Sequence, residues 1–264
     1  MPEPDEQALL SVAHEAARAG ATELRARFGR RADGVQTKST PTDLVSEADV
    51  AAERAIREVL GRRRPEDSIL AEEGGATGGA AGDDGLRWVV DPLDGTINFL
   101  FGIPAFAVSL ACEDASGKLV GLILDPVRDE CFSATRSSAA TLNGEPIQGS
   151  ERTDLGRTLV ATGFGYDARV RARQAAVVAR LLPRVRDIRR VGAAALDLAW
   201  VACGRFDAYY ERGVQPWDVA AGALIAARAG LVVRTLPAAD EDAAGIVAAP
   251  EGVIEELFEL VVRP

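Results

Sequence analysis

The chain has 264 residues, 47% of them hydrophobic, so it can bury a sizeable core as one large domain or two closely packed lobes. Its formal net charge of −10 argues against a nucleic-acid or anionic-membrane partner, because both are recognised through clustered Lys and Arg. The acidic start of the sequence, and no apolar stretch near the roughly 20 residues that a membrane span needs, predict a cytoplasmic protein.

Cysteine and histidine chemistry is disfavoured by number and spacing. Cys112, Cys131 and Cys203 are odd in number and far apart, which fits neither a disulfide framework nor a zinc site. We expect them to be reduced and mostly buried thiols. The single histidine, His14, falls in a helical pattern, where we expect a solvated or half-buried position rather than a catalytic one.

The first half of the chain begins with helical periodicity and continues with strands. Helices are predicted over residues 6–28 and 47–61. The predicted strands are residues 67–73, 87–91, 106–114, 118–126 and 130–136, with a hairpin turn at residues 143–146. The glycine-rich stretch 74–85 predicts a mobile loop.

From residue 158 strands and helices alternate. The predicted strands are 158–164, 187–192, 206–211 and 230–235, and the predicted helices are 167–182, 194–203 and 218–229. This alternation predicts a mixed α/β (α+β) fold. We expect two lobes, residues 1–150 and 151–264, divided near residues 146–156.

The segment WVVDPLDGTINF, residues 88–99, places carboxylates directly behind a strand. Pro92 and Gly95 turn the chain there, so Asp91 and Asp94 lie at the C-terminal end of the strand. A purely structural interpretation exists, because these are common turn residues and Asp94 could cap a helix that begins at Thr96.

Three further acidic features strengthen a functional interpretation. A carboxylate pair ends another apolar strand, one Asp starts a small-residue helix, and the segment DLVSEAD contributes two more. These residues are Glu72 with Glu73, Asp218, and Asp43 with Asp49. They also have structural interpretations, as solvated loop charges, an N-cap, and a capping box of Ser46 with Asp49. Four separate structural explanations are less convincing than one shared site.

Carboxylates gathered from several strand ends repel one another unless a cation neutralises them. A set of oxygen ligands without His or Cys suits Mg²⁺ or Mn²⁺. Two such ions about 3.5 to 4 Å apart can polarise a phosphoryl oxygen, activate a water and neutralise a leaving alkoxide. The predicted chemistry is in-line attack of water on a phosphate monoester. A covalent phosphoenzyme is not expected, because no motif contains a His or Cys nucleophile.

These motifs resemble those of the inositol monophosphatase family, within the magnesium-dependent, lithium-sensitive phosphatase superfamily. The resemblance runs from about residue 8 to 260, and its strongest elements are WVVDPLDGTINF and WDVAAG. The segments KSTPTDLVSEAD, AEEG and RRVGAAALDLAWVACGRFDAYYE match in the same order. The resemblance implies a layered α/β/α/β/α sandwich of the inositol monophosphatase and fructose-1,6-bisphosphatase type, and usually a homodimer.

The resemblance also implies a site for two or three Mg²⁺ ions. Glu72, Asp91 and the backbone carbonyl of Leu93 would hold the first ion. Asp91 would bridge to a second ion, which Asp94 and Asp218 complete. A third, weaker ion would again use Glu72. Li⁺ would occupy the second site after the alcohol leaves and inhibit uncompetitively.

Catalytic and substrate contacts follow from the same resemblance. Thr96 and Asp49 match the pair that orients and deprotonates the attacking water, and Glu72 joins them as a catalytic residue. The phosphate would lie on backbone N–H groups at a helix N-terminus, which supplies positive potential in an acidic site. The residues expected to contact substrate are Asp94, Gly95, Thr96, Gly192, Ala193, Ala194, Glu211 and Asp218.

The expected substrate is myo-inositol 1-phosphate. Many relatives carry Ser or Thr where this chain has Ala193, so a hydroxyl contact to the substrate is lacking. Histidinol phosphate, fructose 1,6-bisphosphate and a 3′-phosphoadenosine nucleotide remain alternatives. The last two would favour basic residues near the pocket, for which the sequence offers Arg169, Arg171 and Arg173. A non-catalytic regulator is disfavoured by the complete set of carboxylates and Thr96.

Overall fold

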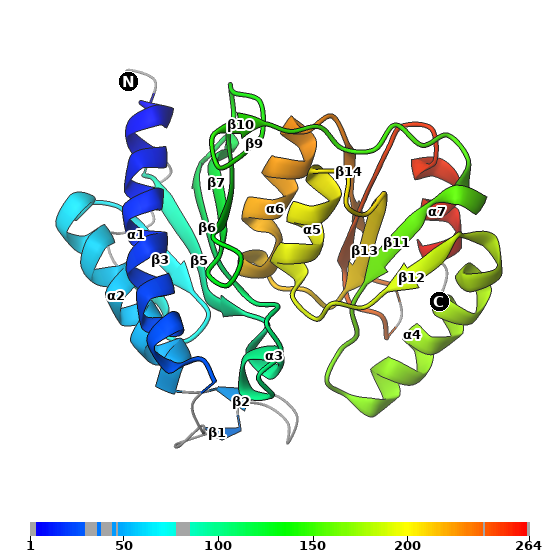
Figure 1. Cartoon of the computed structure of the whole chain (residues 1–264), viewed down its shortest axis with the longest axis horizontal. Helices are drawn as coiled ribbons and strands as arrows, with labels where there is room; N and C mark the ends of the chain where they lie inside the picture. Colours follow the sequence, from blue (N-terminus) through cyan, green and yellow to red (C-terminus); the bar gives the residue numbers. More distant parts are fainter. Residues whose placement is uncertain are drawn as a thin grey trace.

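The computed structural model describes residues 4–29, 36–37, 44–45, 47–77, 85–239 and 241–262. Five layers alternate between helices and sheets (Figure 1): α1 with α2, an eight-stranded sheet, α5 with α6, a five-stranded sheet, and α4 with α7. The layered α/β/α/β/α fold predicted from the sequence is confirmed. None of the helices in the described part of the chain has the length and hydrophobicity needed to cross a membrane.

The first layer is the pair α1 (Glu6–Arg27) and α2 (Glu47–Arg63). Asp5 begins α1 as its N-cap, because its carboxylate accepts hydrogen bonds from the backbone N–H groups of Gln7 and Ala8. Alanines line the buried face of α1, and their small side chains let it pack closely on α2 and on the sheet. This placement fixes α2 beside strand β5.

The first sheet contains strands from residues 68–146. In spatial order they are β10 (Glu145–Pro146), β9 (Thr141–Leu142), β8 (Glu130–Thr135), β7 (Gly117–Asp125), β6 (Ala107–Asp114), β5 (Arg87–Asp94), β3 (Ser68–Ala71) and β4 (Gly75–Thr77). Most neighbours are antiparallel, but β3 and β5 run parallel. Their C-terminal ends therefore lie at the same edge of the sheet.

The middle layer joins the two sheets. Helices α5 (Ala194–Ala202) and α6 (Pro216–Arg228) lie between them, and α6 packs against strands of both. One buried cluster accordingly contains Val89 and Ile123 of the first sheet together with Tyr209 and Ala248 of the second. The core thus continues from one half of the chain into the other.

The second sheet contains strands from residues 159–249. Their spatial order is β12 (Asp187–Arg189), β11 (Leu159–Thr162), β13 (Ala208–Arg212), β15 (Gly245–Ala249) and β14 (Val232–Leu236). β11 runs parallel to β13, so the segments that follow these two strands meet at one edge. Helices α4 (Ala168–Leu181) and α7 (Ile254–Val262) cover the outer face.

Smaller elements complete the chain. They are α3 (Thr96–Leu100), the 3₁₀ turns Leu155–Arg157 and Leu182–Arg184, and the paired strands β1 (Gln36–Thr37) and β2 (Leu44–Val45). Asn143 and Gly144 have φ values of 51° and 87°, which confirms the predicted hairpin turn between β9 and β10.

Most predicted elements are confirmed, with a few differences. Helix α6 begins at Pro216, two residues before the predicted start, and the strand predicted to end at residue 91 continues to Asp94. β15, α7 and β4 were not predicted. β4 corrects the expectation of a loop over residues 74–85, because Gly75–Thr77 pairs with β3. The two sheets fall on either side of residue 150, but the division into lobes stays a prediction because α6 packs on both.

The cysteines are free, as expected. Cys112 is buried, whereas Cys131 and Cys203 are partly buried. His14 is half-buried on α1, as expected, and its Nδ1 lies 3.6 Å from the Sγ atom of Cys131.

Candidate active site

A cavity of about 440 Å³ lies where the two sheets and the middle layer meet. Its walls come from the C-terminal ends of β3 and β5, the segments after β11 and β13, and the first turns of α5 and α6. The predicted residues that line it are Glu72, Asp91, Leu93, Asp94, Gly95, Thr96, Gly192, Ala193, Ala194, Glu211 and Asp218. Residues that are far apart in the sequence thus meet in one place, as predicted.

The end of β5 turns two carboxylates toward this cavity. Between Asp91 and Asp94 the register against β6 is irregular, with Asp91 opposite Ser109 and Asp94 opposite Ala107. Pro92 falls inside this irregularity, where its missing N–H costs no ladder hydrogen bond. The Oδ1 atom of Asp91 accepts the N–H of Leu93 at 3.0 Å, which fixes the turn.

Gly95 links β5 to α3 in a conformation that other residues rarely adopt. Its φ is 93°, in the left-handed region. A Cβ atom there would lie 3.0 Å from the carbonyl oxygen of Ala105 and 3.2 Å from the Cβ of Ala193. The tight turn therefore needs glycine for both backbone freedom and space.

Asp94 caps a helix, but a different one from the helix considered in the sequence analysis. Its Oδ1 and Oδ2 accept the N–H groups of Ala194 and Ala195, at 3.1 and 2.7 Å, at the start of α5. Helix α3 instead begins after Gly95, with no side-chain cap. The positive end of the α5 dipole thus stabilises the ionised form of Asp94.

Asp218 and Glu72 approach from two other elements. Asp218 is the third residue of α6 rather than its N-cap: Gln215 is the N-cap, and its backbone N–H donates to the Oδ2 of Asp218 at 2.7 Å. Glu72 directly follows β3, and its N–H donates to the carbonyl of Val90 at 3.3 Å. The parallel pairing of β3 with β5 therefore carries Glu72 alongside Asp91.

Thr96, at the cavity wall, pairs with Asp49, which lies behind it. The Thr96 hydroxyl lies 3.0 Å from Oδ1 of Asp49 and 3.2 Å from the carbonyl oxygen of Leu93. Asp49 is fully buried on α2. Ser46, its predicted capping-box partner, lies outside the described residues, as do Asp43 and residues 78–84 of the glycine-rich stretch.

Glu211 reaches the cavity from the end of β13. The phenol of Tyr209 donates to its Oε2 at 2.8 Å. The carboxylate lies directly against Gly163, where a Cβ would come within 2.0 Å of Oε2. Burial raises the pKa of Glu211 to about 7, although the Tyr209 hydrogen bond and the charge of Arg190 oppose the shift. A surface salt bridge is the alternative role for Glu211, but its side chain lies at the cavity wall and is hydrogen-bonded to Tyr209.

The carboxylates influence one another electrostatically. Burial raises the pKa of Asp91 well above its usual value, and repulsion from Glu72, Asp94 and Asp218 adds to the shift. Burial also raises the pKa of Asp94 to about 7, against the opposing effect of its two N–H partners. A bound cation would favour the ionised forms that this crowding disfavours.

The donor set fits a hard divalent cation, because the side chains offer carboxylate oxygens and the turn offers the Leu93 carbonyl. Among the described residues, no three His, Cys, Asp or Glu side chains already converge as closely as they do around a bound metal ion. A cation that used several of these carboxylates would therefore draw them inward, against the repulsion that raises the pKa of Asp91.

Arg190 also lines the cavity, and the sequence analysis did not single it out. Its guanidinium lies 6.0 Å from the ring centre of Phe164, another lining residue. Arg190 comes two residues before Gly192, a predicted substrate contact, in the segment RRVG. This short sequence separation could have identified it as a cavity residue.

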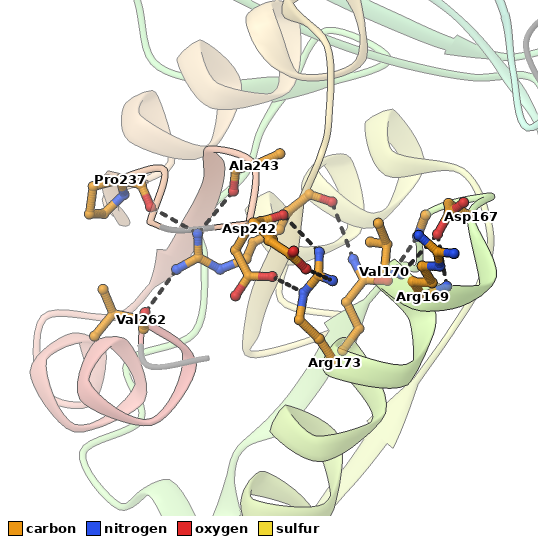
Figure 2. Close-up of polar contacts among 12 residues, drawn as sticks. Asp167, Arg169, Val170, Arg173, Pro237, Asp242, Ala243 and Val262 are labelled. Atoms are coloured by element: carbon orange, nitrogen blue, oxygen red, sulfur yellow. Dashed lines mark hydrogen bonds and ion pairs between the residues drawn. The ribbon is translucent and has the colours of Figure 1, made fainter.

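The arginines proposed from the sequence serve other contacts. Arg173 Nε donates to Asp242 at 2.8 Å (Figure 2), and Arg171 Nη1 donates to the carbonyl of Tyr166 at 2.6 Å. Arg169 is exposed on α4 and is not among the described residues that line the cavity. Arg212 does line it, but its guanidinium donates to the carbonyls of Pro237, Ala243 and Val262, all labelled in Figure 2.

Asp197 is a second residue that sequence reasoning missed. It is 1% exposed in the first turn of α5, and neither carboxylate oxygen has a hydrogen-bond partner among the described residues. Burial, and then the charges of Glu211 and Asp94, raise its pKa well above the usual value. An acidic residue in the otherwise apolar run AALDLAWVA was the signal.

Known proteins are similar to this chain in sequence and in fold. Residues 5–262 match the inositol monophosphatase family. Inositol-1-monophosphatase SuhB of Mycobacterium tuberculosis is 42% identical over 99% of this chain and 96% of its own length. The Nus factor SuhB of Escherichia coli is 41% identical over 85% of this chain and 84% of its own.

A solved structure gives the same result. The inositol monophosphatase of Anabaena (Nostoc) sp. superposes with a TM-score of 0.85 at 34% identity, covering 98% of this chain and 97% of its own. The match therefore extends over both sheets and the cavity between them. This chain belongs to the inositol monophosphatase family.

Proposed function

We propose that this protein hydrolyses a small phosphate monoester, with myo-inositol 1-phosphate as its principal substrate. As a member of the family it is a phosphoric monoester hydrolase, and the family is Mg²⁺-dependent in general. The observation that carries the proposal is the meeting of carboxylates from β3, β5 and α6 in one cavity, next to the buried Thr96–Asp49 pair.

The proposed metal ligands are Glu72, Asp91, Asp94, Asp218 and the carbonyl of Leu93, holding two or three Mg²⁺ ions. Mn²⁺ suits the same oxygen donors. Once bound, the ions supply positive charge that stabilises the transferring phosphoryl group and lowers the pKa of a coordinated water. The raised pKa of Asp91 and of Asp94 is consistent with this assignment, because burial disfavours both ionised carboxylates and a bound cation would favour them.

The proposed proton transfer runs through Thr96. Its hydroxyl hydrogen is directed to Asp49 at 3.0 Å, which leaves lone pairs of Oγ1 to accept a hydrogen bond from the attacking water. Asp49 is buried and takes the proton at the end of this relay. The backbone N–H groups of Gly95 and Thr96, at the start of α3, are the proposed phosphate ligands.

The proposed contacts to the alcohol come from the wall segments that follow β12 and end β13. Glu211 accepts hydrogen bonds from hydroxyl groups, and the backbone of Gly192 to Ala194 borders the same space. Ala193 is only 2% exposed, so its contribution is backbone and packing against Gly95 rather than a side-chain contact.

The test is release of inorganic phosphate in Mg²⁺, compared with EDTA, for wild type and Asp91→Asn. Asp91→Asn keeps an oxygen that can accept the Leu93 N–H, so the fold is expected to stay intact. It removes the negative charge proposed to bridge two ions, so activity is expected to fall by more than ten-fold. More than a tenth of wild-type activity in the variant, or no Mg²⁺-dependent release by the wild type, would refute the proposal. High-millimolar Li⁺ is expected to inhibit uncompetitively.

A substrate with a second anionic group is the other candidate, favoured by Arg190. This guanidinium lines the cavity and has no hydrogen bond to any described residue. Specificity constants for myo-inositol 1-phosphate, histidinol phosphate, fructose 1,6-bisphosphate and 3′-phosphoadenosine 5′-phosphate decide between the candidates. If the second group is recognised here, Arg190→Gln weakens use of the bisphosphates more than use of the monophosphates.

We propose that the protein is a homodimer in the cytoplasm. Phe101 and Val127 are 74% and 42% exposed, and Arg128 links their two loops by donating to the Pro104 carbonyl at 2.9 Å. Exposed apolar side chains on these two linked loops support self-association. The free cysteines support a reducing compartment. Light scattering and cell fractionation test the two statements.

A further inference from the structure

Helix α2 contacts the chain segment that directly follows Glu72. Glu53 of α2 is only 4% exposed. Its Oε2 accepts the N–H of Glu73 at 2.9 Å, and its Oε1 accepts the N–H of Gly74, also at 2.9 Å. A single buried carboxylate therefore fixes the two peptide groups that come after Glu72.

Arg57, one turn further along α2, extends this contact. Its Nε donates to Oε1 of Glu53 at 2.6 Å, and its Nη2 donates to the carbonyl of Gly75 at 2.9 Å. Its Nη1 also donates to the hydroxyl of Thr77. Glu53 and Arg57 together therefore hold the backbone from residue 73 to β4; we call this pair the α2 clamp.

Gly74 shows how closely the α2 clamp fits. A Cβ at this position would lie 2.5 Å from Oε1 of Glu53 and 2.8 Å from Nη2 of Arg57. The absence of a side chain is therefore what lets both groups reach the backbone.

The same face of α2 also carries Asp49. Asp49, Glu53 and Arg57 are spaced four residues apart, so they follow one another along one side of the helix. Asp49 bonds Thr96, while the α2 clamp bonds the segment next to Glu72. One rigid helix thus contacts both the water-activating pair and the loop of a metal ligand.

We propose that Glu53, with Arg57, is a positioning pair that holds Glu72 at the place where it binds a divalent cation. The inference rests on the proposed metal site. Neither residue is among the described residues that line the cavity, so the pair acts through the backbone of residues 73–75. By this means α2 also sets the position of Glu72 relative to Asp49 and Thr96. Outer partners of metal ligands commonly change metal affinity by about 10- to 100-fold when altered.

The test measures the Kd for Mg²⁺ by calorimetry, together with hydrogen exchange at the amides of residues 73 and 74. Glu53→Gln replaces one acceptor oxygen by an NH₂ group facing an N–H donor. Its Kd is expected to rise about ten-fold, with faster exchange at both amides.

Arg57→Gln separates positioning from simple electrostatics. Removing a positive charge near a cation site would tighten Mg²⁺ binding if charge alone mattered. Loss of the α2 clamp predicts the opposite, a Kd raised several-fold.

Glu113→Gln is the matched control. Glu113 of β6 also accepts a hydrogen bond from an arginine, because Arg87 Nε of β5 donates to it at 2.7 Å. Neither residue is among the described residues that line the cavity. Glu113→Gln changes the net charge by the same amount as Glu53→Gln. It is expected to leave the Kd for Mg²⁺ within two-fold of wild type.

Several results would overturn the inference. A Kd within two-fold of wild type for folded Glu53→Gln would do so, as would tighter binding by Arg57→Gln. In both cases Mg²⁺ binding by the wild type would leave the proposed function standing. If the wild type bound neither Mg²⁺ nor Mn²⁺, the inference and the proposed metal site would fall together.

Discussion

We propose that Glu211 binds the alcohol part of the substrate rather than its phosphate. It lies on the wall formed by β13, with Tyr209 donating to one of its oxygens and Gly163 leaving room for it. An ionised carboxylate accepts hydrogen bonds from hydroxyl groups, each worth about 1.5 to 3 kcal/mol.

Glu211→Gln is therefore expected to lower kcat/KM for myo-inositol 1-phosphate by roughly 10- to 100-fold, the rate equivalent of that energy. Hydrolysis of p-nitrophenyl phosphate, a hydroxyl-poor ester, is expected to change little. The two esters are compared at saturating Mg²⁺. Equal losses on both would show that Glu211 supports the metal site, and no loss on either would show that it does not contact the substrate.

Asp94 gives the metal-free protein a characteristic pH dependence. Its pKa is about 7 in the folded chain, against 3.8 for an unperturbed aspartate. Between these values the folded chain keeps a proton that the unfolded chain has released, so this group lowers stability as pH rises from about 4 through 7. A shift of about three units corresponds to at most about 4 kcal/mol.

The side chain introduced by Asp94→Asn does not titrate. The variant is therefore expected not to lose stability through this position as pH rises. In EDTA, the free energy of unfolding of the variant minus that of wild type is expected to increase between pH 4.5 and 8. Contributions from groups that do not interact with Asp94 cancel in this difference, and urea titrations at the two pH values measure it. A difference that did not change with pH would show that Asp94 is already ionised without a cation.

At the scale of elements, the junction between β5 and α3 depends on one glycine. Gly95 and Gly102 flank α3, and both have positive φ, 93° and 70°. A Cβ on Gly95 would press on Ala105 and Ala193, whereas a Cβ on Gly102 would meet nothing within 4 Å.

Alanine at these two positions therefore separates backbone strain from crowding. Gly102→Ala is expected to cost about 1 to 2 kcal/mol, from left-handed backbone strain alone. Gly95→Ala is expected to cost about 1 to 3 kcal/mol more, because the neighbouring segments must move. Urea unfolding in EDTA measures both, and similar losses would mean that the turn relaxes without disturbing its neighbours.

At the scale of the whole molecule, the two sheets share their middle layer. Helix α6 belongs to the second half of the sequence but packs on β5 to β8 of the first sheet. We propose that residues 1–150 and 151–264 are lobes in topology but not independent folding units. Either half alone would expose the face that α6 covers.

The full chain is therefore expected to unfold in one cooperative transition, although chains of this length often do not. Calorimetry checks this, because the calorimetric enthalpy and the van't Hoff enthalpy should agree. The measurement is made in EDTA so that cation binding adds no second equilibrium. Two resolved transitions would instead show that the lobes are separate domains.

Sequence patterns alone predicted most local elements and the candidate residues of the site. Apolar periodicity depends on neighbours a few residues apart, and it predicted α1, α2, α4 and α5 within two residues of their ends. The carboxylates at strand ends were predicted because turn residues and apolar runs lie next to them. The short strand β15 and the helix α7 carried comparable patterns and were not recognised.

Which groups meet across the chain depends on the tertiary structure. Asp94 caps α5, a hundred residues away, rather than the helix that follows it. Glu53 binds the backbone after Glu72, and Arg190 reaches the cavity while Arg173 turns to Asp242. Each of these side chains could satisfy its hydrogen-bonding groups in several ways that look equivalent in sequence. The choice between them depends on sheet order and on which helix ends are brought together, and packing over long sequence distances determines both.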